Sequence, residues 1–380
     1  MIFDLRFLFV FLHHTQQTLS TGNDGKGLLH YPEIIKEVLR MNDDFSVREI
    51  ALRFPDEVQQ LCAFLPGFGL RCETDIEVAF GVYDADDTLL GCGCAAGSLL
   101  KCFAVRESLR GQNALGALVS ALVQNRFAAG YYDLFVITRA HNEALFTACG
   151  FFTAAKTDAL VMLENRRNGP ESFCRPLLQP EDEGKCVGAI VMNCNPFTLG
   201  HLALVEYAAA SCDALHLFVV EENKSFFDTA SRFALVEKGT AHLSNVRVHL
   251  SGHYMISSAT FPTYFLKEGE DASLLYARLD ITLFAQRIAP TLHIRKRFAG
   301  QEPFDPTTAC YNRAMRDILP QHGVEFCEIP RKEADGTAIS ASRVRELLRN
   351  EGCSERVLAM VPESTGAYLK AHFPCKADEV

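Results

Sequence analysis

The sequence predicts an α/β protein with two domains, an α+β domain followed by a nucleotide-binding domain built on a parallel sheet. Three observations predict this class. The chain has 380 residues of which 48% are hydrophobic, enough for two or three cores. Strand and helix patterns alternate in both halves, and a polar stretch rich in charge, Pro and Gly separates them. We therefore expect domains at residues 40–164 and 186–375, joined by a linker at 165–185.

The first domain begins with a run of strands over residues 76–105, in which "DADD" at 84–87 predicts a turn. An amphipathic helix is predicted at 114–130 and a further strand at 132–140. A short helix follows, and we expect it to end at Gly150 because glycine commonly takes the left-handed position there. The pattern is thus strand–helix–strand–helix.

A loop at the start of the predicted helix at 114–130 carries candidate ligand-binding residues. Arg110, Gly111 and Asn113 precede the helix, where backbone N–H groups favour a pyrophosphate. Together with "LFTACGFF" at 145–152, the stretch "LRGQNALGALV" at 109–119 resembles the acetyltransferase fold of the GNAT superfamily, which implies an acyl-CoA site. That family's loop runs Arg/Gln-x-x-Gly-x-Gly/Ala, whereas Asn113 and Leu115 stand at the later positions. Asn tolerates left-handed geometry, but Leu does not allow the close approach that Gly permits. A structural or partner-binding remnant of that fold is the alternative.

Composition excludes several classes of protein. A formal net charge of −10 argues against binding to nucleic acid. The apolar run near the N-terminus is about eight residues long, too short to span a bilayer, and whether residues 1–22 belong to the mature protein stays open. Fourteen cysteines without a CxxC pair indicate a reducing compartment. We expect Cys92 and Cys94 to lie on a strand rather than to bind a metal. We also expect the protein to be cytoplasmic and not to bind a membrane.

The second domain opens with an apolar strand, "GAIVMN" at 188–193, of the kind that is buried in parallel sheets. A helix at 199–212 and a strand at 214–220 complete a βαβ unit. Ligands of such sheets bind at the carboxyl ends of the strands. The polar sequence "NCNPFTLGH" at 193–201 stands at this end. The residues expected there are Asn193, Asn195, Pro196, Phe197, Thr198, Gly200 and His201.

These residue types suit a phosphate chain. Gly200 lets the backbone come close, and the helix N-terminus favours negative charge. His201 can donate to a phosphoryl oxygen and Thr198 offers a hydroxyl, so we expect stabilisation of a transition state by donors already in place. Neither residue has an obvious activating partner for nucleophilic catalysis. The alternative is that His201 merely caps its helix, and that Ser340, at the start of a later helix, is likewise an ordinary N-cap.

The tetrapeptide Thr198–His201 resembles the (H/T)xGH signature of the nucleotidyltransferase superfamily, and "AISASRVRELL" at 338–348 resembles its second signature, Ile-Ser-x-Ser-x-x-Arg. The resemblance implies phosphate contacts by Lys224 and Arg232. Ser340 and Ser342 open a helix, and Arg343 and Arg345 add positive charge for the β- and γ-phosphates. The loop at Gly300, Gln301 and Glu302 either contacts adenine or ribose or is a plain turn. We expect His201, Thr198, Ser340, Ser342 and Arg345 to be catalytic.

Several further segments of the second half resemble the citrate lyase ligase family, among them "LHLFVVEENKSFF", "YMISSATFPTYFLK" and "FAGQEPFDPTTACYN". The resemblance extends to both domains, because that family also carries an acetyltransferase-like N-terminal half. The resemblance implies an enzyme that uses ATP with Mg²⁺ and acetate to acetylate the prosthetic-group thiol of the citrate lyase acyl carrier protein, releasing AMP and pyrophosphate. Ser257, Ser258 and Thr260 are candidates for the acetate pocket, with a helix start as the alternative. Two other functions stay open: an adenylyltransferase acting on phosphopantetheine or a mononucleotide, and a binding protein without catalysis. Whether the first domain transfers acetyl groups or docks the carrier also stays open.

Overall fold

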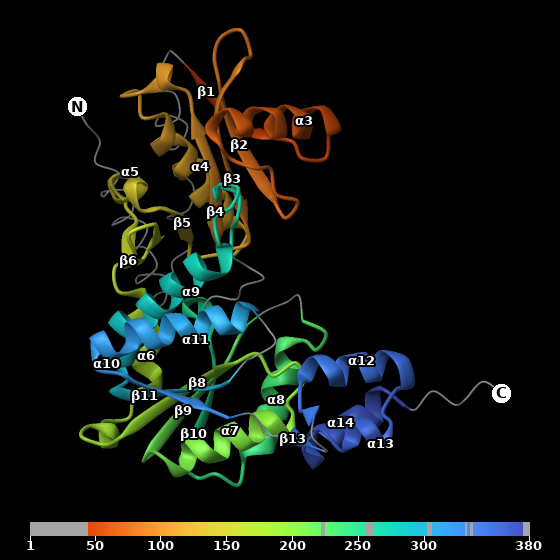
Figure 1. Ribbon diagram of the computed structural model, residues 1–380. Coiled ribbons are helices and arrows are strands. Elements are labelled where there is room, and N and C mark those ends of the chain that lie inside the picture. Colours follow the sequence, from red (N-terminus) through yellow and green to blue (C-terminus); the bar gives the residue numbers. More distant parts are fainter. Residues whose placement is uncertain are drawn as a thin grey trace, which may run out of the picture. The chain divides into compact units, whose positions relative to one another are not determined.

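The computed structural model describes residues 45–221, 225–255, 261–301, 306–330, 333–334 and 337–374. The chain forms two compact units, whose elements are labelled in Figure 1. Unit 1 runs up to Arg167 and also includes Pro262–Glu270 from the second half of the sequence. Unit 2 comprises the remainder from Asn168 onward. Among the described residues, no helix is long and apolar enough to cross a membrane.

Unit 1 contains a seven-stranded sheet in the order β1-β2-β3-β4-β5-β7-β6. The β4–β5 pair is parallel and the other pairs are antiparallel. The polar turn predicted between β2 and β3 is present, because the Asp84 carboxylate accepts hydrogen bonds from the backbone N–H groups of Asp86 and Thr88. The strands are β1 Ser46–Ile50, β2 Val78–Tyr83, β3 Leu89–Ala96, β4 Leu99–Val105, β5 Phe135–Arg139, β6 Phe152–Lys156 and β7 Leu160–Glu164.

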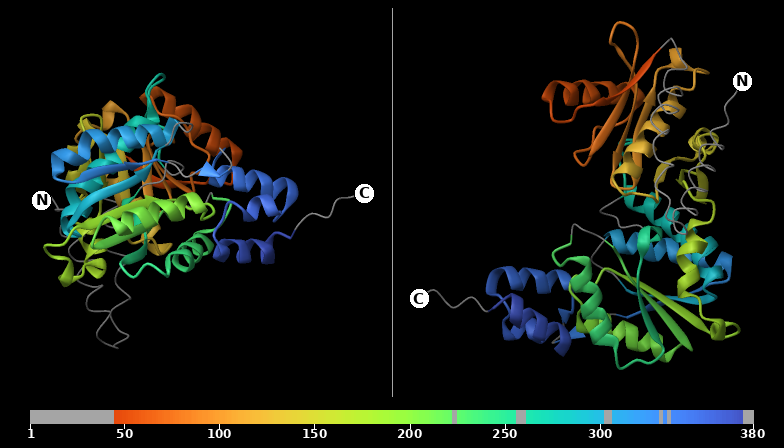
Figure 2. Two further views of the ribbon diagram at one scale, coloured as in Figure 1. Left: turned by 60° about the horizontal axis from the view of Figure 1, so that its bottom comes forward. Right: turned by 180° about the vertical axis from the view of Figure 1, so that it is seen from behind.

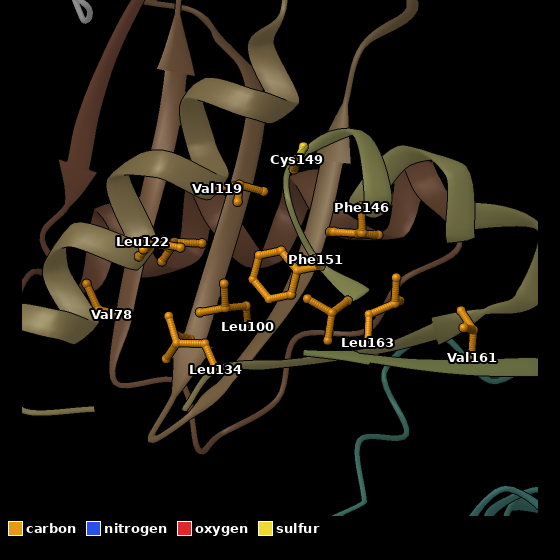
Figure 3. Close-up of a cluster of buried hydrophobic side chains, with 13 residues drawn as sticks. Val78, Leu100, Val119, Leu122, Leu134, Phe146, Cys149, Phe151, Val161 and Leu163 are labelled. Carbon is orange, nitrogen blue, oxygen red and sulfur yellow. The ribbon is translucent and has the colours of Figure 1, made fainter. Parts of the chain in front are cut away.

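The helices of unit 1 are α3 Pro55–Phe64, α4 Ala114–Ala128 and α5 Glu143–Ala148. Helix α4 packs its apolar side on the sheet, and Figure 3 shows Val119 and Leu122 directed toward Leu100 and Phe151. Each such side chain, when fully buried, contributes about 1.5–3 kcal/mol to folding. Gly150 has a φ of 88° just after α5, as predicted for a helix end. The α+β fold expected for the first domain is confirmed.

Unit 2 is built on a five-stranded sheet in the order β10-β9-β8-β11-β12, in which every pair is parallel. Helices α7 and α8 cover one face, and α9 and α11 cover the other (Figures 1 and 2). The Rossmann-like, parallel-sheet fold predicted for the second domain is confirmed. The strands are β8 Val187–Met192, β9 Ala214–Val219, β10 Val246–Leu250, β11 Ile294–Gly300 and β12 Glu325–Ile329. The helices named are α7 Leu199–Ala210, α8 Thr229–Thr240, α9 Ala272–Leu283 and α11 Pro306–Ile318.

The strand order creates a switch point between β8 and β11. From β8 the chain proceeds through α7 and α8 to β10 at one edge, and β11 then returns to the other side of β8. The carboxyl ends of such a strand pair diverge into opposite connections, which leaves room for a ligand. The sequence at 193–201 follows β8, and Gly300 ends β11.

A group of helices follows the sheet of unit 2. Helices α12 and α14 lie beside α8 in both views of the ribbon (Figures 1 and 2). Their apolar side chains, including Val344 and Leu369, enclose Phe227 in a small core. The remaining elements are α6 Gly169–Cys174, α10 Ala289–Thr291, α12 Ala341–Glu351, α13 Glu355–Leu358, α14 Glu363–His372 and the strands β13 Glu333–Ala334 and β14 Thr337–Ala338.

Two features differ from the sequence expectations. The segment expected to be a linker at 165–185 contains α6 and belongs to unit 2 from Asn168 onward, where Glu171 pairs with Arg287 and the buried Asp182 pairs with Arg247. These partners are far apart in sequence, so local composition did not reveal them. Cys62 and Cys72 form a disulfide, where only reduced thiols were expected. Cys92 and Cys94 lie on β3 as predicted.

Candidate active site

The loop after β8 forms one side of the candidate site. It runs from Asn193 to Thr198, with Cys194 in the left-handed region at φ 52° and a cis peptide bond between Asn195 and Pro196. Pro196 and Phe197 are buried, and Phe197 belongs to the core beneath the sheet. These two residues therefore shape the loop from below, whereas the sequence led us to expect them among the residues that bind ATP.

Thr198 and His201 form a reciprocal cap at the start of α7. The Thr198 hydroxyl oxygen accepts from the His201 backbone N–H at 3.3 Å. In return, the Thr198 backbone N–H donates to Nδ1 of the His201 ring at 3.1 Å. Because a backbone N–H can only donate, Nδ1 must present a lone pair, so the ring proton of neutral His201 sits on Nε2. The imidazole is thus fixed as a donor through Nε2.

The side chains of Asn193 and Asn195 hold the two neighbouring loops together. Asn195 Oδ1 accepts from the backbone N–H of Phe227 at 3.0 Å. The Asn193 side-chain amide and the Ser225 hydroxyl form longer hydrogen bonds, each of 3.4 Å, through Nδ2 and Oδ1 of the asparagine. These bonds join the loop after β8 to the loop after β9. The two asparagines therefore organise the site rather than present free amides to a ligand.

Gly200 brings the second signature next to the first. A Cβ atom added at Gly200 would lie 3.2 Å from the carbonyl oxygen of Ile339. Ile339 directly precedes Ser340, whose hydroxyl caps α12 by accepting from the Arg343 backbone N–H at 3.1 Å. The N-termini of α7 and α12 therefore meet. Because both helix ends carry partial positive charge, their junction favours an anion.

Arg345 links the two segments directly. Its Nη1 donates to the carbonyl oxygen of Asn195 at 2.5 Å, and its Nη2 donates to the hydroxyl of Ser342 at 3.0 Å. Burial, followed by the nearby positive charge of Arg349, lowers the pKa of Arg345. By contrast, Arg343 is partly exposed and donates to Glu346 at 2.7 Å, so part of its charge is already offset. Arg345 is the better placed of the two for a phosphate.

Arg232 has a different place from the one the resemblance implied. It is fully buried, with 0% of its surface exposed. Its guanidinium donates to the carbonyl oxygens of Asn193 at 2.8 Å, Val220 at 2.7 Å and Phe227 at 3.1 Å, and to the Thr229 hydroxyl at 2.9 Å. These contacts clamp the carboxyl ends of β8 and β9 beneath the site. Its burial argues against direct contact with ATP.

The end of β11 supplies the other side of the switch point. Among the described residues, no atom beyond the chain neighbours of Gly300 lies within 4 Å of a Cβ position there. Its carbonyl accepts from Nδ2 of Asn312 at 3.0 Å. Gln301 is exposed, and its backbone N–H donates to Ile329 at 2.8 Å. The residues Lys224, Ser257, Ser258, Thr260 and Glu302 lie outside the described parts of the chain.

In unit 1, the loop at the start of α4 keeps part of the expected geometry. Gly111 and Asn113 both have positive φ, 81° and 60°, so Asn113 adopts the left-handed conformation that glycine would take. Its Oδ1 lies 2.3 Å from where a Cβ on Gly116 would be, which shows that this side chain fills the space above the helix. Arg110 is exposed and pairs with Glu107 at 3.0 Å.

Sequence reasoning missed two contributors to the candidate site. Cys194 takes a left-handed conformation without being glycine, and no pattern in the sequence indicated it. The carbonyl of Met360, far along the chain, accepts from the backbone N–H of Leu199 at 3.0 Å. This bond satisfies a free N–H at the first turn of α7. Such a partner depends on how the C-terminal helices pack, so local sequence could not identify it.

Comparison with known proteins agrees with this architecture. Residues 187–369 match the family model "Citrate lyase ligase C-terminal domain". The citrate (pro-3S)-lyase ligase of Klebsiella pneumoniae is 42% identical over 311 residues, which cover 80% of this chain and 90% of that protein. The corresponding ligase of Escherichia coli (strain K12) is 38% identical, over 83% of this chain and 90% of that protein.

Among solved structures, one similar chain is Thermotoga maritima TmcAL bound with alpha-thio ATP. Its TM-score is 0.33 and its identity 15%, over 49% of this chain and 55% of that one, a likeness too low to carry a functional argument. The sequence relatives are much closer, and they extend over nearly their whole length. The chain therefore belongs to the citrate lyase ligase family.

Proposed function

We propose that the protein is an ATP-dependent acid–thiol ligase that forms AMP. It activates acetate as acetyl adenylate and acetylates the prosthetic-group thiol of the citrate lyase acyl carrier protein. The observation that carries this proposal is the meeting of the two signature segments, where Gly200 packs on Ile339 and Arg345 bonds to Asn195. Family membership supports the choice of a ligase.

In the first step, a carboxylate oxygen of acetate attacks the α-phosphorus of ATP. The bond between that phosphorus and the bridging oxygen of the β-phosphate breaks, and pyrophosphate leaves. Negative charge builds on the phosphoryl oxygens, where Nε2–H of His201 and the backbone N–H of Gly200 donate. Thr198 holds the imidazole through the cap described above.

The leaving pyrophosphate is assigned to the N-terminus of α12. Ser340 and Ser342 lie in the first turn there, and Arg345 brings a guanidinium with fixed geometry. Arg343 adds a weaker contribution because Glu346 competes for it. The proposed contacts to adenine or ribose are those of Gly300, Gln301 and Glu302, and Lys224 is proposed to reach a phosphate.

In the second step, the sulfur of the carrier thiol attacks the carbonyl carbon of acetyl adenylate. The carbon–oxygen bond to the phosphate breaks, AMP leaves with that electron pair, and the thiol proton passes to solvent. The products are the acetyl thioester and AMP. A thioester is thus made at the cost of one ATP cleaved to AMP and pyrophosphate.

Mg²⁺ enters the proposal as part of the ATP substrate. Within the described residues, no group of three or more His, Cys, Asp or Glu side chains is arranged to hold a metal ion. The residues present therefore do not form a protein cage, and a triphosphate with water ligands is the usual way such an ion is carried. The expected cytoplasmic location stays a prediction.

The test is product analysis with purified protein, ATP, acetate and deacetylated carrier protein. We expect AMP and pyrophosphate in equal amounts with the acetylated carrier, and exchange of label between pyrophosphate and ATP that requires acetate. ADP and phosphate, or no exchange with any small carboxylate, would contradict the proposal. An adenylated phosphopantetheine formed without acetate would instead identify an adenylyltransferase.

A further inference from the structure

The parallel strands β4 and β5 of unit 1 pair over a short distance. Within residues 45–221, their ladder consists of Leu99 opposite Phe135 and Leu100 opposite Val136. Both strands continue beyond it, β4 to Val105 and β5 to Arg139. The facing edges of these continuations therefore need other partners for their N–H and C=O groups.

Residues from the second half of the sequence occupy this place. Tyr264, Phe265 and Leu266 are buried within unit 1, with 3%, 6% and 7% of their surfaces exposed. The Tyr264 hydroxyl lies close to the backbone of Cys102 on β4. The carbonyl of Phe265 accepts from Nη2 of Arg139 on β5 at 3.1 Å. The segment thus lies against β4 and bonds to Arg139 of β5, beyond the point where these two strands separate.

Charged groups fasten the two ends of the segment. At one end, Oε1 of Glu73 accepts from the backbone N–H and hydroxyl of Thr263 at 3.0 and 3.2 Å. Glu73 is held in turn by the buried Lys101 at 2.7 Å. At the other end, Glu270 pairs with Arg139 through both carboxylate oxygens. Bonds at both ends and in the middle make the segment a fixed part of unit 1.

We propose that residues 262–270 are an internal ligand of unit 1, seated between β4 and β5 so that no extended acyl-CoA arm can enter there. The carboxyl ends of parallel strands, next to the N-terminus of the following helix, are where such an arm would have to lie. The loop at the start of α4 also supports this proposal, because the Asn113 side chain fills the space above Gly116. Unit 1 accordingly does not transfer acetyl groups to the carrier thiol. This consequence rests on the proposed function and places thiol acetylation at unit 2 alone.

Hydrogen exchange on the full-length chain tests the proposal. We expect acetyl-CoA at about 1 mM, enough to detect even weak binding, to leave the exchange of residues 101–105 and 137–139 unchanged. The double variant Tyr264→Ala/Arg139→Ala should speed exchange of both stretches by about tenfold or more, because the segment that packs beside their edges is no longer held in place. Tyr132→Ala, an exposed residue of the same unit, is the matched control and should change neither stretch.

If the double variant also speeds exchange at Ser46–Ile50, unit 1 has unfolded as a whole and the double variant does not test the proposal. The milder variant Tyr264→Phe is then the test. This variant keeps the ring and removes the hydroxyl that lies beside the backbone of Cys102, so faster exchange should be confined to residues 101–105. Protection of residues 101–105 by acetyl-CoA in the wild type, or unchanged exchange in the Tyr264 variants, would overturn the proposal. None of these measurements uses ligase activity, so a chain that failed the product test would still give a clear answer here.

Discussion

Thr198 and His201 fix each other's roles, because the backbone N–H of Thr198 donates to Nδ1 of His201 at 3.1 Å. This bond leaves the ring proton on Nε2 and ties the tautomer to the helix cap. The same two residues therefore cap the N-terminus of α7 and hold the imidazole for the proposed phosphoryl transfer. The alternatives weighed from the sequence, a capping histidine and a catalytic histidine, are compatible in one geometry.

His201→Ala should lower kcat for acetyl adenylate formation by about 10²–10³, the usual loss for one transition-state donor, with little change in ATP affinity. Pyrophosphate exchange and equilibrium ATP binding measure the two quantities. His201→Gln is the matched control, because glutamine at this position can still accept from the Thr198 N–H as in a capping box. We expect Gln to keep the thermal stability and lose the rate. A rate restored by Gln would mean that Ala acts through the cap.

Arg345→Ala should reduce kcat/KM for ATP by about 10- to 150-fold, since a hydrogen bond to a charged group contributes roughly 1.5–3 kcal/mol. The change also removes the link to the Asn195 carbonyl. Arg343→Ala should have a smaller effect, because Arg343 is already paired with Glu346. Steady-state kinetics on both variants provide the comparison. Equal losses, or a larger loss for Arg343, would contradict the assignment.

Gly200→Ala tests the close approach of the two segments. Alanine is favoured over glycine within a helix by about 0.8–1.0 kcal/mol, so a position with free space would gain stability. Here the new Cβ would lie 3.2 Å from the Ile339 carbonyl, and that backbone must move. We expect a folded protein without added stability and with weaker ATP binding, measured by thermal unfolding and titration. A more stable variant of full activity would show that the segments are not in contact.

The main features of the candidate site could be predicted from the sequence because they are local. The site's first segment is continuous in sequence: an apolar strand is followed directly by Asn-x-Asn-Pro and then by Thr-x-Gly-His at the start of a helix. Likewise, Ser340 caps the helix that it begins. The features that the sequence did not predict depend on distant partners. Glu73 and Thr263 bond across 190 residues of sequence, and no periodicity indicates which strand edge a remote segment will meet.

Arg232 shows a second limit of sequence reasoning. A helix pattern gives the face on which a residue lies, but not whether a buried arginine finds carbonyls or a ligand. The partners of Arg232 are carbonyl oxygens at the ends of β8 and β9, and the loop conformations around Asn193 and Val220 place them. These conformations follow from the whole sheet.

Arg232→Lys should reduce the free energy of unfolding by about 3–5 kcal/mol, as expected when a buried charged network loses a partner. Lysine keeps the charge but lacks the planar fork, so the carbonyls of Asn193, Val220 and Phe227 cannot all be satisfied. Urea denaturation measures the loss. Activity should fall together with stability and recover in part at low temperature. Unchanged stability with a raised KM for ATP would instead indicate direct contact with the nucleotide.

Two histidines lie side by side in the sheet of unit 2. His216 on β9 and His249 on β10 lie 3.0 Å apart, between Nδ1 and Nε2. Burial lowers the pKa of each from 6.5 to about 4, with further lowering of the His216 pKa by His249 and of both by Arg247. Asp182, which pairs with Arg247, acts in the opposite direction on His216.

Because both pKa values are lower in the folded state, the unfolded chain binds more protons between pH 6.5 and about 4. The free energy of unfolding should therefore be constant above this window and fall as the pH falls through it. Urea denaturation at several values down to about pH 5 keeps most carboxylates ionised, so the histidines dominate the change. His249→Phe leaves one titrating ring in place of two and relieves the charge on His216, so its stability should depend less steeply on pH than that of the wild type. An equal slope would show that other groups cause the loss.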